Sequence, residues 1–360
     1  MKSRRFFKPL VFVIFPLLAL VIGGLVTYSY TPYSLTIKDV TLDRDTGTLV
    51  KYQGEYGPRT FISDYVAVRI PDTLDGVVIT HIAPSAFERK KLSKVIIGDS
   101  VIHIGKRAFW DSNLSSVKLS ASLTHIGEDA FKFNELVSLK LPETLTRIDA
   151  GAFEYNKLTQ VNLPDSLSHL GADAFQVNKL ISVAIPAAVT RIEEGTFEHN
   201  TLTAITLPKT LEHIHYSAFR YNRIEKVNGK ITHGFIYGEE SNRTLIAYGG
   251  ERKAITLADS VTSIAPHVFD CQHLTAVTLP DSLIHIGSSA FDSNELTEVI
   301  LPDSVTSIGS YAFWGNPTAE IAAPAALKSM GTDALKTRLH PSWNNLDELR
   351  RSLCIVDEPA

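Results

Sequence analysis

The feature that most constrains the fold is a sequence unit that returns every 22 residues. It reads L-V-S-L-K-L-P-E-T-L-T-R-I-D-A-G-A-F over residues 136–153. A fixed period of this length is typical of a solenoid, in which each unit buries its apolar face only against its neighbours. The closing phenylalanine marks the period in two series separated by a gap of 50 residues: Phe87, Phe109, Phe131, Phe153, Phe175, Phe197 and Phe219, then Phe269, Phe291 and Phe313, with Leu335 in the next such position.

The pattern L-x-x-L-x-L in each unit predicts a short strand. Alternation directs its leucines inward and the residues between them outward. A proline ends this strand at positions 142, 164, 186, 208, 280 and 302, because proline lacks the N–H that would extend a ladder. A second short extended piece carries an inward Ile, and the Ala-Phe pair fills the corner of the coil. We therefore predict a mainly β solenoid over residues 65–335, with short strands on two faces and Phe-filled corners.

The two ends of the solenoid depart from the repeat. Residues 34–43 alternate like a half-buried strand, and a turn at 45–47 leads to a returning strand at 48–52. This predicts a capping β-hairpin within residues 31–64, where the first coil would otherwise expose open strand groups. Over residues 336–360, leucines at i, i+3 and i+7 predict a short capping helix.

The 50-residue interval holds 28 extra residues, because 50 minus the period of 22 leaves 28. Two apolar stretches, H-G-F-I-Y-G and T-L-I-A-Y-G-G, lie on either side of a polar turn at 239–243. They predict a β-hairpin inserted at about 229–256. As the main irregularity of the body, this hairpin is a predicted contact surface, with candidate residues Phe235, Tyr237, Arg243 and Tyr248.

Residues 1–30 have the pattern of an export segment. Four basic residues within the first eight precede an almost unbroken apolar run at 10–26. The run is near the lower length limit for a membrane helix, and no A-x-A cleavage site follows it. We predict a signal-anchor transmembrane segment that places the body outside the cytoplasm in the cell envelope. A cleaved signal peptide, which would give a secreted protein, is the alternative.

The unit L-T-x-V-x-L-P-x-S-L-T-x-I-G-x-x-A-F resembles the BspA-type leucine-rich repeat of bacterial surface proteins, over roughly residues 66–335. The resemblance implies a leucine-rich repeat solenoid that is exported or surface-exposed, and some members of the family look like adhesins for host matrix proteins. The motif of that family contains no catalytic residues, so none is carried over.

The asparagines depart from the common leucine-rich consensus, which places Asn or Cys two residues beyond L-x-x-L-x-L. Here they come three residues after the phenylalanine. We predict that their amides bond backbone groups as a structural ladder rather than binding a ligand. The row consists of Asn134, Asn156, Asn178, Asn200, Asn222, Asn294 and Asn316.

The residue just before the inward Ile of the second strand forms a candidate surface column rich in His and Arg. A solvated face produced by repeat duplication is the favoured interpretation. One alternative is a cationic stripe that charges in mild acid and binds anionic glycans, lipids or acidic proteins. The other is a metal site formed by the adjacent imidazoles of His103 and His125. The column consists of His81, His103, His125, Arg147, His169, Arg191, His213 and His285; the metal pair would be His103 and His125.

Charge and motifs exclude several functions. The net charge is −4, and without the four bases of the first 30 residues the body carries 31 minus 39, or −8, which argues against nucleic acid as a partner. No catalytic or nucleotide-binding motif is present, so we expect neither an enzyme nor a cofactor. Cys271 and Cys354 are the only two cysteines, which is too few for a disulfide scaffold. They either pair in an oxidising compartment or are two unrelated thiols, and unrelated thiols are the favoured interpretation.

The outward residues of the first strands are mostly small or neutral. Such a face suits broad, shallow contact. The sequence therefore predicts an exported cell-envelope binding protein that recognises another protein or a glycan at the cell exterior through its extended solenoid surface. A structural envelope protein with no external ligand is the alternative.

Overall fold

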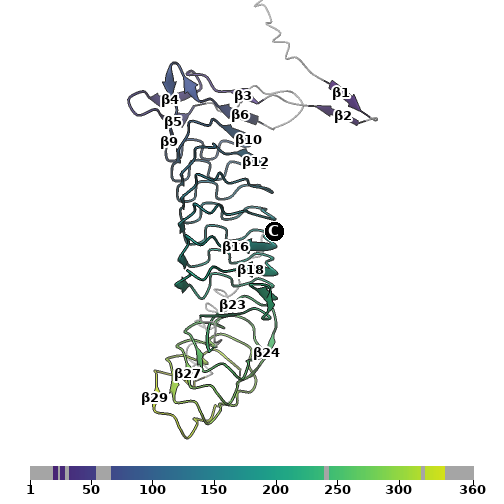
Figure 1. The fold of residues 1–360 in the computed structure, drawn as a ribbon, viewed down its shortest axis with the longest axis vertical. Helices are drawn as coiled ribbons and strands as arrows, with labels where there is room; N and C mark the ends of the chain where they lie inside the picture. The colour runs from purple at the N-terminus through teal and green to yellow at the C-terminus, as the bar shows by residue number, and fades with distance from the viewer. Residues whose placement is uncertain are drawn as a thin grey trace, which may run out of the picture.

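The computed structural model describes residues 19–22, 25–28, 32–53, 66–238, 243–317 and 321–336. In these residues the chain winds into an elongated solenoid, whose coils stack along the vertical axis of Figure 1. Strands and turns make up the coils, and no helix occurs in the described ranges. The predicted mainly β solenoid is confirmed.

The first strands of the coils form one face of the solenoid. In the regular coils they pair in parallel one repeat apart, as Ser182 does with Ala204, whereas residues 230–231 turn back and pair antiparallel with residues 226–227. The sheets of this face have the strand orders β12-β10-β6-β3, β16-β18-β20-β21 and β24-β26. Their strands are β3 (Tyr33–Ser34), β6 (Val66–Ile70), β10 (Leu92–Ile97), β12 (Ser116–Lys118), β16 (Ser182–Ala184), β18 (Ala204–Thr206), β20 (Lys226–Val227), β21 (Lys230–Ile231), β24 (Ala254–Thr256) and β26 (Ala276–Thr278).

The dipeptides that carry the inward Ile form a second face. Their sheets have the orders β15-β14-β13-β11-β9-β5-β4, β17-β19 and β22-β23-β25-β27-β28-β29, in which β4 is Val40–Asp43, β5 is Thr48–Tyr52, β22 is Phe235–Tyr237 and β23 is Thr244–Tyr248. In most of these two-residue strands the second residue is buried and the first is not. The strands are β9 (His81–Ile82), β11 (His103–Ile104), β13 (His125–Ile126), β14 (Arg147–Ile148), β15 (His169–Leu170), β17 (Arg191–Ile192), β19 (His213–Ile214), β25 (Ser263–Ile264), β27 (His285–Ile286), β28 (Ser307–Ile308) and β29 (Ser329–Met330).

The repeat phenylalanines form two stacks through the core. All ten are among the largest fully buried side chains. Within each stack, neighbouring ring centroids lie 4.9–5.8 Å apart and the rings are within 16° of parallel. The period fixes this arrangement, because each coil places its ring directly over the ring of the coil before it, within the range of favourable aromatic contact.

A hairpin lies at the N-terminal end of the second-strand face. β4 (Val40–Asp43) pairs antiparallel with β5 (Thr48–Tyr52), and β5 pairs in parallel with β9. The prediction of one strand over 34–43 is wrong, because a turn at 37–39 separates β3 from β4. Asp39 forms that turn, since its carboxylate accepts hydrogen bonds from the backbone N–H and the hydroxyl of Thr36, both at 2.7 Å. A small hairpin of β7 (Thr73–Leu74) and β8 (Val77–Val78) lengthens the first coil.

The insertion contains a second hairpin. β22 (Phe235–Tyr237) pairs antiparallel with β23 (Thr244–Tyr248), and β23 begins the second-strand face of the following coils. Its two faces pack into different cores. Ile236 and Ala247 belong to the core of the preceding coils, whereas Leu245 belongs to the core of the following coils. The hairpin therefore separates two solenoid segments, and the coils after β23 are turned relative to those before it in Figure 1.

The two hairpins are equivalent in sequence and pairing. Residues 48–52 read T-L-V-K-Y and residues 244–248 read T-L-I-A-Y. Thr48 pairs with His81 as Thr244 pairs with Ser263, and both hairpins contain a register shift two residues after their first strand begins. The closing tyrosines contact the first ring of each stack at a centroid distance of 5.3 Å. Tyr52 is stacked on Phe87 with an interplanar angle of 21°, whereas Tyr248 is tilted by 53° against Phe269. Each solenoid segment thus begins with the same structural unit.

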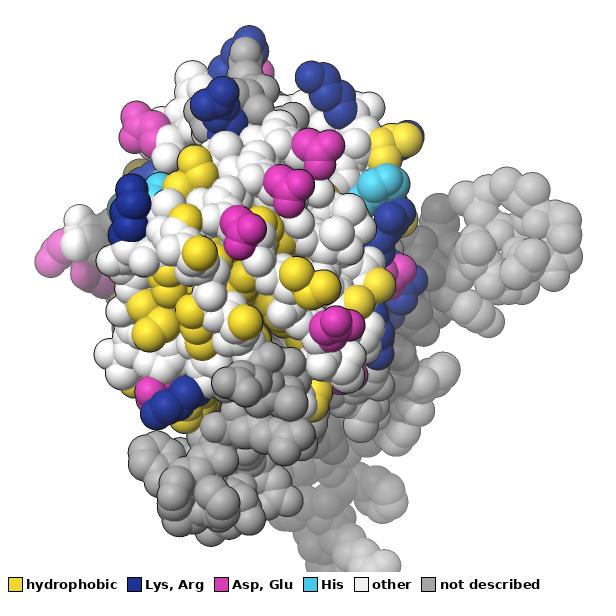
Figure 2. All heavy atoms as spheres, turned by 90° about the horizontal axis from the view of Figure 1, so that it is seen from below, with side chains coloured by type: hydrophobic (Ala, Val, Ile, Leu, Met, Phe, Trp, Pro, Cys, Tyr) yellow, Lys and Arg dark blue, Asp and Glu magenta, His cyan; other side chains and the backbone are white. Residues whose placement is uncertain are grey.

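The chain ends are only partly described. Of the apolar run at 10–26, the described residues lie in β1 (Ala19–Ile22) and in β2 (Leu25–Tyr28), which pair antiparallel, and none of the described residues belongs to a helix that could span a membrane. The predicted C-terminal capping helix lies outside the described residues. The last described coil carries Met330, which is 58% exposed, and hydrophobic side chains gather at this end of the solenoid in Figure 2.

Candidate functional site

The first-strand face is not continuously hydrogen-bonded. Its parallel ladder stops after β12 and resumes at β16, so the equivalent residues 138–140 and 160–162 of the two intervening coils are not in strands. The ladder is likewise not continued by residues 298–300 after β26. Neither interruption was predicted, because all of these residues keep the same inward apolar pattern as the paired coils.

A groove lies at the first interruption, between two neighbouring coils. It has a volume of about 500 Å³ and is lined by residues 138–141 and 143 on one coil and residues 160–165 on the next. Leu139 and Val161 are buried beneath it, while Lys140 and Asn162 are exposed at its surface. The groove is therefore formed by backbone and by outward polar side chains of the first-strand face.

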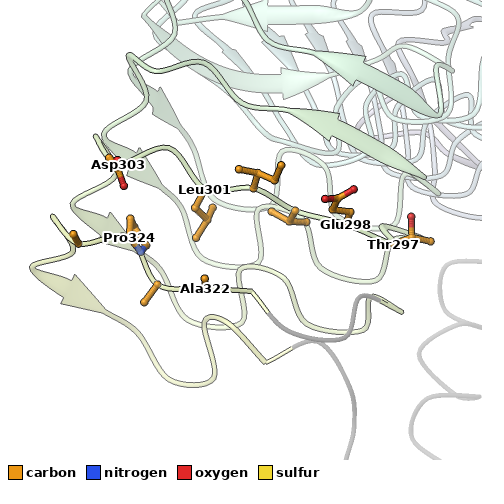
Figure 3. Close-up of a pocket in the computed structure, with 10 residues that line it drawn as sticks. Thr297, Glu298, Leu301, Asp303, Ala322 and Pro324 are labelled. Atoms are coloured by element: carbon orange, nitrogen blue, oxygen red, sulfur yellow. The ribbon is translucent and has the colours of Figure 1, made fainter.

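A second groove lies at the other interruption, in the C-terminal segment. It measures about 450 Å³ and is lined by residues 297–301 and 303 on one coil and 322–325 on the next. Figure 3 shows Glu298 and Leu301 on the upper of the two coils and Ala322 and Pro324 on the lower one. Both grooves thus occur at the same place in the repeat, where first strands of adjacent coils are not paired.

The predicted His/Arg column lies on the second-strand face, and five of its eight members are brought together in one sheet. His81, His103 and His125 pair in parallel register, with ring centroids 5.6 Å apart between the first two and 4.4 Å apart between the last two. Arg147 and His169 continue the column on β14 and β15. Arg191 pairs with His213 in a separate sheet, and His285 lies between Ser263 and Ser307 in the C-terminal segment.

Asp149 joins three members of the column and was missed by the sequence reasoning. Its carboxylate lies 2.6 Å from Arg147 Nε and 2.7 Å from His125 Nε2. His169 Nε2 lies 3.8 Å away. The signal that would have found it is alternation, because residue i+2 of a short strand points to the same side as residue i. The column is therefore partly neutralised rather than purely cationic.

Burial lowers the pKa of two column histidines below the ordinary value. For His103 the causes are burial and then the neighbouring His125 and His81, and for His169 they are burial and then Arg147. Asp149 acts in the opposite direction on both. The cationic-stripe interpretation is weakened, because these two imidazoles require stronger acid than a free histidine before they carry charge.

Metal binding has no structural support in the column. Two adjacent imidazoles at His103 and His125 fall short of the three or four ligands of a typical zinc site. No group of three or more His, Cys, Asp or Glu residues with metal-binding geometry is found among the described residues.

The predicted asparagine row lies buried at the start of each coil, and each member links adjacent coils. Asn178 is typical. Its Nδ2 donates to the carbonyl oxygens of Phe153 at 2.9 Å and Phe175 at 3.2 Å, and its Oδ1 accepts from the N–H of Leu158 at 3.0 Å. The members are 2–7% exposed, which leaves little surface for a ligand: Asn134, Asn156, Asn178, Asn200, Asn222, Asn294 and Asn316.

The four hairpin residues proposed as a contact surface differ in how far they are exposed. The prediction is wrong for Phe235 and Tyr248, which are 8% and 1% exposed and pack against Phe269 in the core. They are buried because β22 and β23 separate the two segments instead of projecting from them. Tyr237 is partly buried, and Arg243 is exposed.

Comparison with known proteins identifies the repeat. The profile of the family described as BspA type Leucine rich repeat region (6 copies) matches residues 69–180, 124–239 and 248–340. These ranges extend over well more than half of the chain. A search of curated proteins found no match.

Solved structures with a similar fold are bacterial leucine-rich repeat proteins. A protein from Bacteroides ovatus is 21% identical with a TM-score of 0.50, over 90% of this chain and 91% of that one. A leucine-rich cell surface protein from Faecalibacterium prausnitzii is 22% identical with a TM-score of 0.56, over 88% and 97% of the two chains. The pneumococcal vaccine antigen PcpA is 22% identical with a TM-score of 0.51, over 79% and 70%. At these identities the likeness shows the shared fold.

Proposed function

Because the chain belongs to the BspA-type leucine-rich repeat family, we propose that it is a bacterial surface or secreted protein that binds another protein through its first-strand face. Leucine-rich repeat domains of this kind are generally binding scaffolds rather than enzymes. The observation that carries the proposal is the interrupted ladder of this face, where both grooves lie.

The second-strand face is the less favoured binding surface. Asp149 neutralises part of its charge, and burial holds the pKa of His103 and His169 low. A structural envelope role without an external ligand remains the alternative function. It predicts that substitutions on either face leave the behaviour of the cell unchanged.

We also propose export to an oxidising compartment, with residues 10–26 as a signal-anchor. The basic flank of this run supports export. A further support is Cys271, which is disulfide-bonded, so the favoured expectation of an unrelated thiol is wrong for this residue. Disulfides persist mainly outside the reducing cytoplasm. Cell fractionation followed by N-terminal sequencing tests both points. A mature chain that begins after residue 26 would replace the anchor with a cleaved signal peptide, and a protein found only in the cytoplasm would overturn export.

Site-specific photocrosslinking in the producing organism tests the binding face. A photoreactive amino acid is placed at Ser182 on the first-strand face, and in a second variant at Ser168, which is exposed beside the second-strand face. We expect a discrete protein adduct from position 182 and none from position 168. An adduct only from position 168 would assign binding to the other face, and no protein adduct from either would favour the structural role.

A further inference from the structure

Four basic side chains gather on the first-strand face at the N-terminal end of the solenoid. They are Arg69 on β6, Lys94 on β10, Lys118 on β12 and Lys140, which occupies the position equivalent to Lys118 one repeat later. All four are exposed, and their coils follow one another at the N-terminal end of the stack in Figure 1. We call these four residues the basic strip.

No acidic side chain shares this part of the face. The other outward residues of the same coils are Ala67, Ile96, Ser116 and Ser138. Within the described part of the chain, none of the four cations has an ion-pair partner. The outward residues of the coils that follow carry no charge: Gln160, Asn162, Ser182, Ala184, Ala204 and Thr206. The strip is thus a local positive surface on a body whose net charge is negative.

Lysines elsewhere in the same coils are paired with acids. Lys106 Nζ lies 2.7 Å from Glu128 Oε1 in the next coil, and Lys132 pairs in the same way with Glu154. The basic strip instead places like charges at equivalent positions of neighbouring coils, an arrangement that destabilises a sheet. Such a local conflict, left without a compensating acid, indicates a surface retained for function.

We infer that the basic strip binds an extended acidic segment of a partner protein, a deepening that rests on the proposed protein-binding function. Complementary charge attracts such a segment to the strip, while the acidic remainder of the body repels it elsewhere. Lys140 also lines the groove of about 500 Å³, so a side chain of the segment can enter the groove at this end of the strip. The flat surface of a bilayer cannot follow the strip into the groove.

The spacing of the strip indicates the length and pattern of the segment. Adjacent coils are ~4.8 Å apart, so the four cations span roughly 14 Å along the solenoid axis, which an extended chain of about five residues covers. Arg69 and Lys118 lie in one column of outward positions and Lys94 in the other, since Ile96 pairs with both Arg69 and Lys118. An extended chain presents successive side chains to opposite sides. Acidic residues at successive positions therefore meet both columns.

Binding of a fluorescent decamer of glutamate to the full-length protein, followed by anisotropy, tests the charge complementarity. The decamer of glutamine is the matched uncharged probe and should not bind. The double variant Lys94→Gln/Lys118→Gln should weaken binding of the glutamate peptide by about tenfold, because it removes two exposed ion pairs. Binding by the wild-type protein should also weaken as the salt concentration rises.

A second double variant separates the strip from the net charge. Lys51→Gln/Lys328→Gln removes the same charge from the second-strand side, where both lysines are exposed. This variant should bind the glutamate peptide as the wild-type protein does. Equal loss in both double variants would overturn the inference, and so would equal binding of the two peptides or binding of neither.

Photocrosslinking in the producing organism identifies the occupant. Ser116 is exposed and pairs with Lys94 in the ladder, so a photoreactive amino acid placed there lies within the strip. Mass spectrometry should map the adduct to an acidic stretch of a partner protein. A crosslinked stretch without acidic residues would contradict the inference.

Two further outcomes distinguish the strip from other anion sites and from the proposed function. Heparin, or vesicles of phosphatidylcholine and phosphatidylglycerol, that bind through the strip while the glutamate peptide does not would assign it to a polysaccharide or a lipid surface and overturn the inference. A protein adduct at Ser182 that persists in the Lys94→Gln/Lys118→Gln variant would preserve the proposed function and reject the strip as its site.

Discussion

Replacement of Asn178 by Ala should destabilise the solenoid well out of proportion to the size of the side chain. The amide of Asn178 satisfies the N–H of Leu158 and the C=O of Phe153, which belong to the neighbouring coil. Asn178 is 7% exposed, so its removal leaves the N–H of Leu158 without a protein partner, while the C=O of Phe153 keeps only the hydrogen bond from Asn156 Nδ2 at 3.1 Å. An unsatisfied buried donor costs about 1–3 kcal/mol, and water entering the vacated space recovers part of this. We expect a loss of about 1–3 kcal/mol in the free energy of unfolding.

Urea denaturation compared with the wild-type protein measures this loss, and amide exchange at Leu158 shows whether it arises locally. Exchange is necessary because repeat proteins can unfold in parts. The control is Asn162→Ala, since Asn162 is exposed and makes no side-chain hydrogen bond within the described structure. That change should stay within ~0.5 kcal/mol.

Asn178→Asp separates the donor role of the amide from its acceptor role. The carboxylate can still accept from Leu158 N–H, but it faces the carbonyl oxygens of Phe153 and Phe175, to which the amide donated. Burial against acceptors raises the pKa of the new carboxyl. The variant should therefore be most stable in acid, where the carboxyl is protonated, and lose stability as the pH rises through that raised pKa. If Asn178→Ala matches the Asn162→Ala control and the Leu158 amide stays protected, the structural ladder interpretation is refuted.

Three further outcomes are expected. Phe153→Ala opens a cavity between two stacked rings and should cost about 3–5 kcal/mol in urea denaturation, with an effect below ~1 kcal/mol contradicting the stack as a source of stability. Burial and then Arg220 lower the pKa of His199 from 6.5 to about 4. The stability that its neutral form contributes is therefore complete above pH 6.5 and is lost as the pH falls towards 4. His199→Phe should reduce this pH dependence in thermal unfolding, and an unchanged dependence would assign it to other groups. Asp149→Asn removes a carboxylate that raises the pKa of His103 and His169. Both imidazole rings should therefore titrate at lower pH when followed by NMR. Unchanged titration would exclude the ion-pair geometry described for Asp149.

The repeat and its inward residues were predictable because they obey strict periodicity. Every phenylalanine of the stack occupies an equivalent place in a coil of constant length, so one correct assignment fixes all the others. The asparagine positions were predictable for the same reason. Their hydrogen-bond geometry required only that a buried amide satisfy the backbone at a corner.

The irregular parts were predicted poorly because their environments depend on packing between segments. The apolar stretches at 235–237 and 244–248 identify a hairpin, but not which of its faces are covered. The signal that was available is the match between T-L-V-K-Y at 48–52 and T-L-I-A-Y at 244–248, which indicates the same unit at the start of each segment. Asp149 escaped notice because most coils carry Gly or Ala at its position, so no column of acids marks it.

The interrupted ladder at residues 138–140 and 160–162 shows that the first strands, second strands, ring stack and asparagine row contribute unequally to holding the solenoid together. At the boundary between the coils of Phe153 and Phe175, the second strands pair, the rings stack and Asn178 bridges the coils, while the first strands stay apart. The first-strand ladder is therefore the layer that can be interrupted without loss of the stack.

Binding specificity can therefore change at the outward residues of the first strands without loss of the core. Outward residues of the first strands contact neither the ring stack nor the asparagine row, and surface substitutions away from such features usually alter stability by less than ~0.5 kcal/mol. Substitutions at outward positions such as 160 and 162 therefore leave the core and its period intact. Because the C-terminal segment starts with its own hairpin and has its own groove at residues 297–325, the same freedom exists independently in both segments.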